Sequence, residues 1–141
     1  MRRRAALAAA LLLPPAARRA FAQVPGGPEQ RWYIAAESMR ERALAWADQP
    51  FGAVVVLGAT LVGEGPSRVV KDADPTAHAE RVAIREARRR LGRQDLAGAV
   101  LYSTSRPCAA CEDAAARAGI VRMYYGAGLT DGGPPRAAAT P

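Results

Sequence analysis

The chain has one histidine and two cysteines, and these three residues lie in two short segments. His78 lies in the segment DPTAHAE, and Cys108 and Cys111 lie in the segment RPCAAC. Pro107 favours the first turn of a helix, so both cysteines are expected at a helix N-terminus that follows a strand. Their spacing of three residues places both sulfur atoms on one side of that helix. The amides at a helix N-terminus lower thiol pKa values, which favours the thiolate that binds metals.

His78 is expected in the first turn of the preceding helix, so the two helix N-termini are predicted to meet at one edge of a sheet. One imidazole and two thiolates are three of the four ligands of a tetrahedral zinc site. The chain has no further histidine or cysteine, so a metal bound by one chain would keep the open position that is typical of catalytic zinc. Glu80 is then the candidate acid–base residue. Side chains two residues apart within a helix point in different directions, so this role requires the metal to lie beyond the end of the helix.

The elements that must position these residues follow from the apolar pattern. Apolar residues spaced three and four apart predict a helix from Trp32 to Trp46. A β-branched run predicts a strand at 51–57, which is expected to form a hairpin with a second strand at 60–65. The remaining predicted elements are a helix at about 76–91, a strand at 99–104, a helix at about 108–118 and a strand at 120–125. This order predicts an α/β fold with a mixed sheet, in which the hairpin is antiparallel and the last two strands are parallel.

The basic charge of the chain lies mostly in its first 22 residues. These carry five arginines and no acid, and the rest of the chain holds 15 basic and 13 acidic side chains, a charge of +2 instead of the +7 of the whole sequence. A domain with this charge has little basic surface, so nucleic acid is disfavoured as a partner. No apolar run reaches the roughly 18 residues that a membrane-spanning helix needs.

Residues 1–22 resemble an export signal. Three arginines precede the apolar run Ala5–Leu13, and Ala20-Phe21-Ala22 is an A-x-A cleavage site; the consecutive arginines resemble a twin-arginine signal. We expect a periplasmic or exported protein, with no membrane contact after removal of the leader. Its domain would occupy residues 23–126, and the Gly-, Pro- and Ala-rich residues 127–141 would form a disordered tail. The alternative is an extension that is not a signal, and the protein is then cytoplasmic.

The two short segments match a known signature. His78-Ala79-Glu80 followed by Pro107–Cys111 has the form H-x-E…P-C-x-x-C, and the chain resembles the zinc-dependent cytidine and deoxycytidylate deaminase-like superfamily. The segments PFGAVVV, DPTAHAERVAIREA and VRMYYG are similar to the branch that holds guanine, cytosine and tRNA adenosine deaminases. The resemblance covers about residues 28–126 and implies a three-layer α/β/α cytidine-deaminase-like fold.

The resemblance also implies roles for individual residues. His78, Cys108 and Cys111 would bind one Zn²⁺ per chain, and zinc lowers the pKa of a bound water. The resulting hydroxide would attack the amino-bearing carbon of the substrate ring, with Glu80 as the proton shuttle. A homodimer is expected on the same basis. The residues expected to contact the substrate are Phe51, Ser67, Ala77 and Pro107.

The chain departs from the family pattern at positions that bear on the substrate. Arg106 and Ala110 stand where the branch commonly has Glu and Met, and Ser67 stands where it often has a base-binding Asn. A hydroxyl cannot reproduce the paired donor and acceptor of a carboxamide. Phe51 is either a surface on which a flat base stacks or a core aromatic. Arg106 either binds a substrate oxygen or is solvated, and solvation is the simpler interpretation. The cluster Arg88–Arg90 is interpreted as a solvated helix face, with contact to phosphate as the alternative in an enzyme that acts on tRNA.

The leading functional hypothesis is deamination of a small nucleobase or nucleoside of the guanine, cytosine or adenosine type. A tRNA adenosine deaminase is the first alternative, and the export signal and the small charge both disfavour it. A thiol–disulfide protein would explain the C-x-x-C spacing, but it leaves His78 and Glu80 without a role. A deaminase-fold protein that only binds a ligand is the third alternative, because a fold alone does not establish a function.

The leader generates the first testable prediction. If residues 1–22 are an export signal, mass spectrometry of the protein from its native source will show a mature chain that begins near Gln23. A mature chain that retains Met1 contradicts export.

Overall fold

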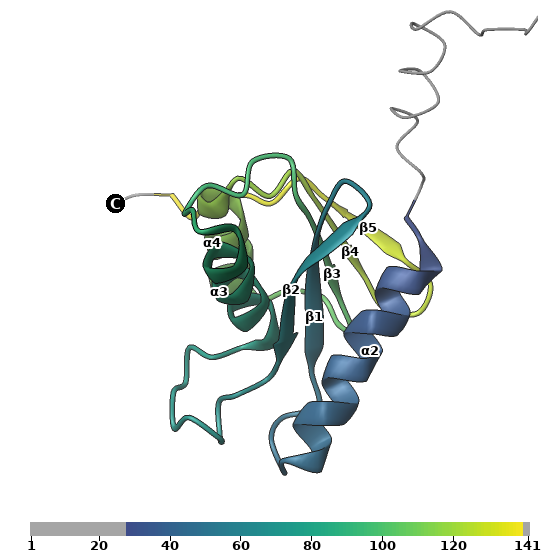
Figure 1. Ribbon diagram of the computed structural model, residues 1–141, viewed down its shortest axis with the longest axis vertical. Coiled ribbons are helices and arrows are strands. Elements are labelled where there is room, and N and C mark those ends of the chain that lie inside the picture. The colour runs from purple at the N-terminus through teal and green to yellow at the C-terminus, as the bar shows by residue number, and fades with distance from the viewer. Residues whose placement is uncertain (1–27, 140–141) are drawn as a thin grey trace, which may run out of the picture.

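The structure, a computed structural model, describes residues 28–139, and the predicted export signal lies outside these described residues. Figure 1 shows how the elements are arranged around one sheet. In chain order the elements are α2 (Gln30–Ala45), β1 (Gly52–Leu57), β2 (Thr60–Pro66), α3 (Ala79–Leu91), β3 (Val100–Ser103), α4 (Ala109–Ala118), β4 (Arg122–Tyr125) and β5 (Thr130–Gly133).

The sheet is mixed, as the sequence predicts. Its strand order is β2-β1-β3-β4-β5. β1 is antiparallel to both β2 and β3, β3 and β4 are parallel, and β5 is antiparallel to β4. Parallel neighbours need a long crossover connection, and here α4 supplies it. This connection places the N-terminus of α4 directly after β3.

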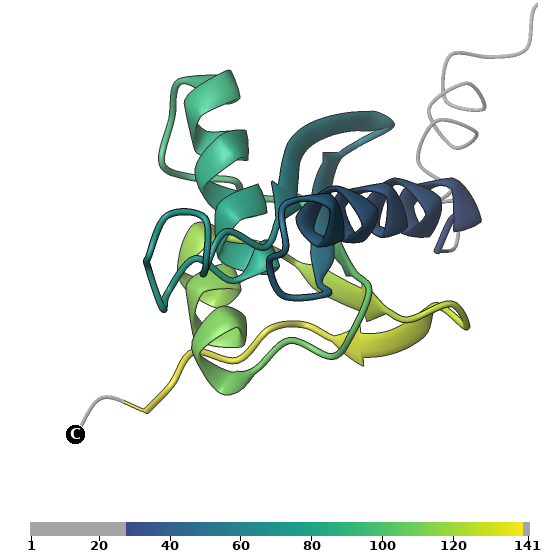
Figure 2. The same ribbon diagram turned by 90° about the horizontal axis from the view of Figure 1, so that it is seen from below.

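Helices cover both faces of the sheet, which makes three layers. α2 lies on one face, and α3 and α4 lie on the other (Figure 1 and Figure 2). Successive side chains of β1 point to opposite faces: Val54 and Val56 belong to the apolar cluster under α2, while Ala53 and Val55 belong to the cluster under α3 and α4. Burial on both faces explains why β1 is an unbroken apolar run.

α3 lies unusually close to β2. A Cβ atom at Gly63 would be 2.2 Å from the carbonyl oxygen of Ala83, and one at Gly65 would be 2.0 Å from that of Ala79. Because neither glycine has a side chain, the helix backbone rests directly on the strand. This contact fixes the height of the N-terminal end of α3 above the sheet.

The prediction of a disordered tail from residue 127 is wrong for Thr130–Gly133, which form β5 and pair with Met123, Tyr124 and Tyr125 of β4. Two glycines and an aspartate have low strand propensity, so the segment carries no local strand signal. Its pairing with β4 and an ion pair of 2.7 Å between Arg122 and Asp131 hold it instead.

The segment that follows β5 runs back to α4. The amides of Arg136 and Ala138 donate hydrogen bonds to the carboxylates of Glu112 and Asp113, at 3.0 Å and 2.7 Å. Two acidic residues of α4 therefore hold this segment by its backbone.

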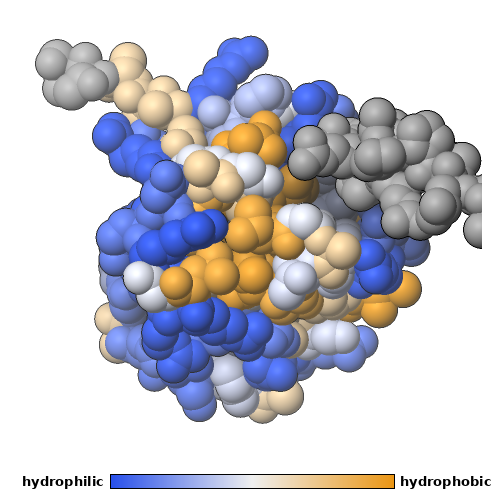
Figure 3. All heavy atoms as spheres, turned by 45° about the horizontal axis from the view of Figure 1, so that its top comes forward, coloured by the Kyte–Doolittle hydropathy of each residue, from blue (hydrophilic) through white to orange (hydrophobic). Residues whose placement is uncertain are grey.

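The surface of the described residues is mixed. In Figure 3 apolar side chains gather at the centre of one face, with hydrophilic side chains around them. None of the helices within residues 28–139 has the length and hydropathy that crossing a membrane requires.

The contact between α3 and β2 generates a prediction on stability. Gly65→Ala should lower the free energy of unfolding by about 1–3 kcal/mol, because a methyl group must displace the backbone of α3. Chemical denaturation followed by circular dichroism measures this change. The matched control is Gly128→Ala, where a Cβ atom meets nothing within 4 Å, and it should change the free energy by less than about 0.5 kcal/mol. Equal effects of the two substitutions would contradict the contact.

Candidate metal centre and adjoining cavity

The three metal-ligating side chains converge, as the sequence predicts. His78 is the N-cap residue of α3 and Cys108 is the N-cap residue of α4. The Nδ1 atom of His78 lies 3.6 Å from Sγ of Cys108 and 3.4 Å from Sγ of Cys111. The ligand atoms of all three residues lie within 4.8 Å of one another, so the three side chains are positioned to hold one metal ion.

The donor atoms fit zinc. One imidazole nitrogen and two sulfurs form an N/S donor set that suits Zn²⁺. Both cysteines are free thiols in the structure. Burial raises the pKa of the Cys111 thiol, and the negative charge of Glu80 raises it further. Both effects favour the uncharged thiol, and a divalent ion would provide the positive charge that stabilises the thiolate of Cys111.

This pKa shift differs from the expectation drawn from the sequence. The amides at the start of α4 were expected to lower the thiol pKa values. For Cys111 the opposite holds, because its side chain is fully buried and faces a carboxylate. Desolvation of the charged form outweighs the helix-end amides at this position.

Glu80 lies beside the ligands and is held in place. Its side chain is 5% exposed, and its Oε1 atom accepts a hydrogen bond of 2.8 Å from the hydroxyl of Ser103, the last residue of β3. His78 has the extended backbone of an N-cap residue, with φ −63° and ψ 152°. The direction of the His78 side chain is therefore not set by the helical periodicity of α3. His78 and Glu80 line the same cavity.

This cavity has a volume of about 190 Å³. It is lined by Gln49, Phe51, His78, Ala79, Glu80, Ser105, Arg106 and Cys108. Phe51 is 39% exposed, which excludes a core role, and it is the one predicted substrate contact that the structure places on the cavity. Gln49 and Ser105 had no sequence signal, because loop residues beside strand ends reach a cavity only through the fold.

The other three predicted substrate contacts, Ser67, Ala77 and Pro107, are not among the residues that line the cavity. Ser67 is fully buried and donates a hydrogen bond of 2.9 Å from its hydroxyl to Oδ1 of Asp48. The carbonyl oxygen of Ala77 accepts a hydrogen bond of 3.0 Å from the amide of Arg68. Pro107 is buried and is not among the residues that line the cavity.

Asp48 holds together two loops near the cavity. Its Oδ2 atom accepts hydrogen bonds from the amides of Val70 and Lys71, at 3.0 Å and 2.7 Å. Burial opposes its charged form, yet these amides, that of Gln49 and the Ser67 hydroxyl lower the pKa of the Asp48 carboxyl below its usual value. The carboxylate therefore ties the loop after β2 to the segment that carries Gln49.

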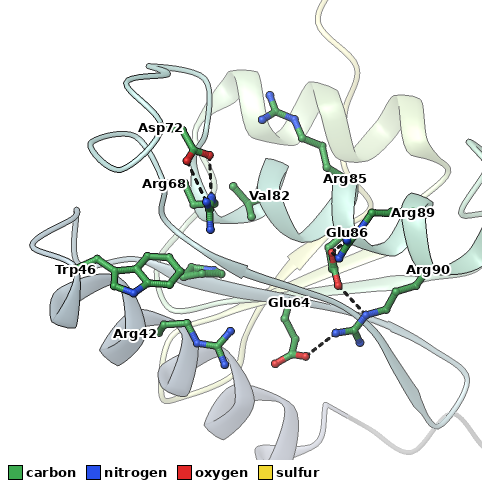
Figure 4. A pocket seen from close by; sticks show the side chains of 11 residues that line it. Arg42, Trp46, Glu64, Arg68, Asp72, Val82, Arg85, Glu86, Arg89 and Arg90 are labelled. Atoms are coloured by element: carbon green, nitrogen blue, oxygen red, sulfur yellow. Dashed lines mark hydrogen bonds and ion pairs between the residues drawn. The ribbon is translucent and has the colours of Figure 1, made fainter.

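A separate groove of about 450 Å³ lies along the outer edge of the sheet, between α2 and α3 (Figure 4). Its carboxylates are paired: Arg68 bonds to Asp72 at 2.8 Å, and Arg90 bonds to Glu64 at 2.8 Å. Glu86 bonds to Arg90 at 2.7 Å and also to Arg89. The groove has none of the metal ligands among its lining residues. Charged side chains beside the edge strand β2 discourage pairing with another strand.

Comparison with known proteins was consistent with this geometry. The family model for the zinc-binding region of cytidine and deoxycytidylate deaminases matches residues 28–127. The chain is 42% identical to a guanine deaminase of Bacillus subtilis over 82 aligned residues. The aligned residues make up 58% of this chain and 53% of that protein. It is 44% identical to a tRNA-specific adenosine deaminase of Agrobacterium fabrum over 84 aligned residues, and these make up 60% of this chain and 55% of that protein. The chain spans about half the length of these curated relatives.

Solved structures share the fold. A chain from a study of A-to-I editing by tRNA:A34 deaminases superposes with a TM-score of 0.67 at 37% identity, covering 70% of this chain and 71% of that one. The X-ray structure of guanine deaminase from Bacillus subtilis superposes with a TM-score of 0.66 at 33% identity, covering 69% of this chain and 62% of that one. The predicted superfamily and fold are thereby confirmed.

The converging ligands generate a prediction on metal content. Elemental analysis of the purified protein should find one zinc per chain, and His78→Ala or Cys108→Ser should remove most of it, because each substitution deletes one of three ligands. The control is Ser105→Ala, which changes the cavity wall but no ligand, and it should keep the metal. Full zinc occupancy in both ligand variants would contradict the site.

Proposed function

The chain belongs to the family of cytidine and deoxycytidylate deaminases, and on this premise we propose that it is a zinc-dependent hydrolase that deaminates a small nucleobase or nucleoside of the guanine, cytosine or adenosine type. The observation that carries the proposal is a buried carboxylate, Glu80, on the same cavity as two of the three metal ligands. A carboxylate next to an open metal position is the arrangement that hydrolytic deamination needs.

The residues of the chain divide the chemistry among them. His78, Cys108 and Cys111 hold the zinc, which when bound activates water for attack and stabilises negative charge. Glu80 takes one proton from the attacking water and delivers it to the ring nitrogen. It then takes the second proton, from the hydroxyl group that the water has become on the ring carbon, and delivers it to the amino group, which leaves as ammonia while the carbonyl forms. Ser103 orients Glu80 through its hydrogen bond to Oε1, so the carboxylate does not need to reorganise during the reaction.

The cavity wall favours a small flat ring. Phe51 offers an aromatic face on which a base can stack, and the carboxamide of Gln49 has the paired donor and acceptor that read a base edge. A volume of about 190 Å³ is below the roughly 300 Å³ at which pockets for larger ligands begin. The cavity therefore suits a single base.

A tRNA adenosine deaminase is the second candidate, and the similarity to the Agrobacterium fabrum protein favours it. A charge of +2 over the chain after residue 22 gives little attraction to a polyanion, so we place the small substrate first. A homodimer is proposed from the family resemblance, and size-exclusion chromatography with light scattering measures it.

Glu80 generates the main prediction on activity. Glu80→Gln should keep zinc but lower kcat by about 10²–10⁴-fold, because an amide cannot carry the proton. Ammonia release from a panel of amino-bearing bases, nucleosides and a transfer RNA measures the rate and separates the two candidates.

The matched control is Glu86→Gln, which changes another glutamate of α3 that faces the groove of Figure 4 and not the cavity. It should keep wild-type turnover. A zinc-loaded wild type with no turnover on any substrate favours a binding protein, and a Glu80→Gln variant with wild-type turnover excludes Glu80 as the proton carrier.

A further inference from the structure

The cavity beside the metal ligands has an inner end and a mouth. At the inner end lies Glu80, which is 5% exposed, together with the ligand His78. Gln49 and Phe51 come from the segment between α2 and β1, and both line the same cavity as exposed residues. A ring whose reacting carbon lies at the metal and Glu80 therefore turns its opposite edge toward Gln49 and Phe51.

Gln49 supplies the one carboxamide among the residues that line the cavity. A carboxamide has a hydrogen-bond donor and an acceptor on two neighbouring atoms. The hydroxyl of Ser105 has both on a single oxygen atom, and the guanidinium of Arg106 only donates. Gln49 is therefore the lining residue that can bind a donor and an acceptor on adjacent atoms of a ring.

The backbone of Gln49 is held in place, and its carboxamide is free. The amide of Gln49 donates a hydrogen bond of 2.8 Å to Oδ1 of Asp48, and its carbonyl oxygen accepts one of 2.8 Å from the amide of Phe51. Within residues 28–139 the hydrogen bonds of Gln49 are these backbone contacts. Asp48 is 7% exposed and also accepts a hydrogen bond from the hydroxyl of Ser67. A buried carboxylate thus places Gln49 at the mouth before a ligand binds.

From this arrangement we propose that Gln49 is a specificity-determining residue. Its carboxamide selects a free base over the corresponding nucleoside, because it binds an N–H group and an adjacent acceptor on the ring edge opposite the amino-bearing carbon. The proposal rests on the deaminase function proposed above.

The chemistry of the bases supports this selection. In free cytosine, adenine and guanine, the edge opposite the reacting carbon can present an N–H group next to an acceptor. A base that gains a sugar loses this hydrogen atom. The carboxamide of Gln49 then keeps one of its two hydrogen bonds, and its own acceptor is left without a donor.

Matched pairs of substrates test the proposal with the zinc-loaded full chain. Each pair consists of cytosine, adenine or guanine and the same base methylated at the nitrogen that bears the sugar in the nucleoside. The methyl group removes the hydrogen atom and adds far less bulk than a sugar. The free member of the productive pair should have a kcat/KM at least about fivefold higher, which is the lower end of the discrimination that a bidentate pair gives.

Substitutions at Gln49 separate hydrogen bonding from size. Gln49→Met keeps the length of the side chain and removes both polar groups, so it should bring the ratio of kcat/KM between free and methylated base close to one. Gln49→Glu keeps an acceptor for the N–H group and should keep part of the preference. A preference that persists in full in Gln49→Met comes from the size of the methyl group and overturns the proposal.

The matched control is Gln94→Met, which changes an exposed glutamine in the loop after α3 that does not line the cavity. It should leave every ratio unchanged. Because Gln49 is exposed, the zinc content and the circular dichroism spectrum of its variants should equal those of the wild type. A change of the ratios in Gln94→Met as large as that in Gln49→Met overturns the assignment to Gln49.

Binding of reaction products separates this proposal from the deaminase function. Uracil and hypoxanthine retain the N–H group and its neighbouring acceptor. Calorimetry should show that each binds more tightly than its form methylated at the same nitrogen, and Gln49→Met should remove the difference. No turnover on any base overturns the deaminase function, and calorimetry then still decides on the role of Gln49. Equal kcat/KM and equal affinity within all pairs overturn the proposal.

Discussion

The backbone of α3 rests on two glycines of β2, and the position of the candidate site depends on this contact. A Cβ atom at Gly65 would lie 2.0 Å from the carbonyl oxygen of Ala79, the first residue of α3. The N-terminal end of the helix is therefore held against the sheet, near the level where β3 ends at Ser103. His78 and Glu80 precede and follow Ala79, so the closest contact of the helix lies between a metal ligand and the candidate proton carrier.

Both ligand-bearing helices begin with a residue that does not cap them. His78 and Cys108 occupy N-cap positions, and neither side chain makes a capping hydrogen bond. A capping Ser, Thr, Asp or Asn stabilises a helix by about 0.5–2 kcal/mol, and these two helices lack that contribution. Their ring nitrogen and sulfur point toward one another instead. Packing of Ala79, Ala83 and Ala115 in the core offsets the loss.

The segment after β4 completes the surroundings of the site. β5 pairs with β4, and the chain then returns to α4, where Glu112 and Asp113 accept hydrogen bonds from its backbone. One wall of a hollow next to Arg106 consists of this segment. Most of its residues are glycine, proline and alanine, so the composition predicts disorder, while backbone hydrogen bonds to α4 and β4 give the segment a defined path.

Other differences between expectation and structure also arise from contacts that are distant in the sequence. Ser67 was expected to contact the substrate, but Asp48, 19 residues earlier, accepts its hydrogen bond in the interior. The pKa of Cys111 was expected to fall, but burial and the charge of Glu80, on a different helix, raise it. Neither burial nor a partner on another element can be read from a local segment.

The sequence by itself predicted the order of the helices and strands from α2 to β4 and the convergence of His78, Cys108 and Cys111. It also singled out Glu80 as the carboxylate beside them. Apolar periodicity, helix-ending glycines and the types of the soft ligands are local properties, and local properties can be read along a chain. Only the tertiary structure decided that Gln49, Ser105 and Arg106 line the cavity, that Ser67 does not, and that residues 130–133 form a strand. The physical reason is that lining a cavity, burial and strand pairing are relations between distant segments, which exist only after the sheet and its helices have packed.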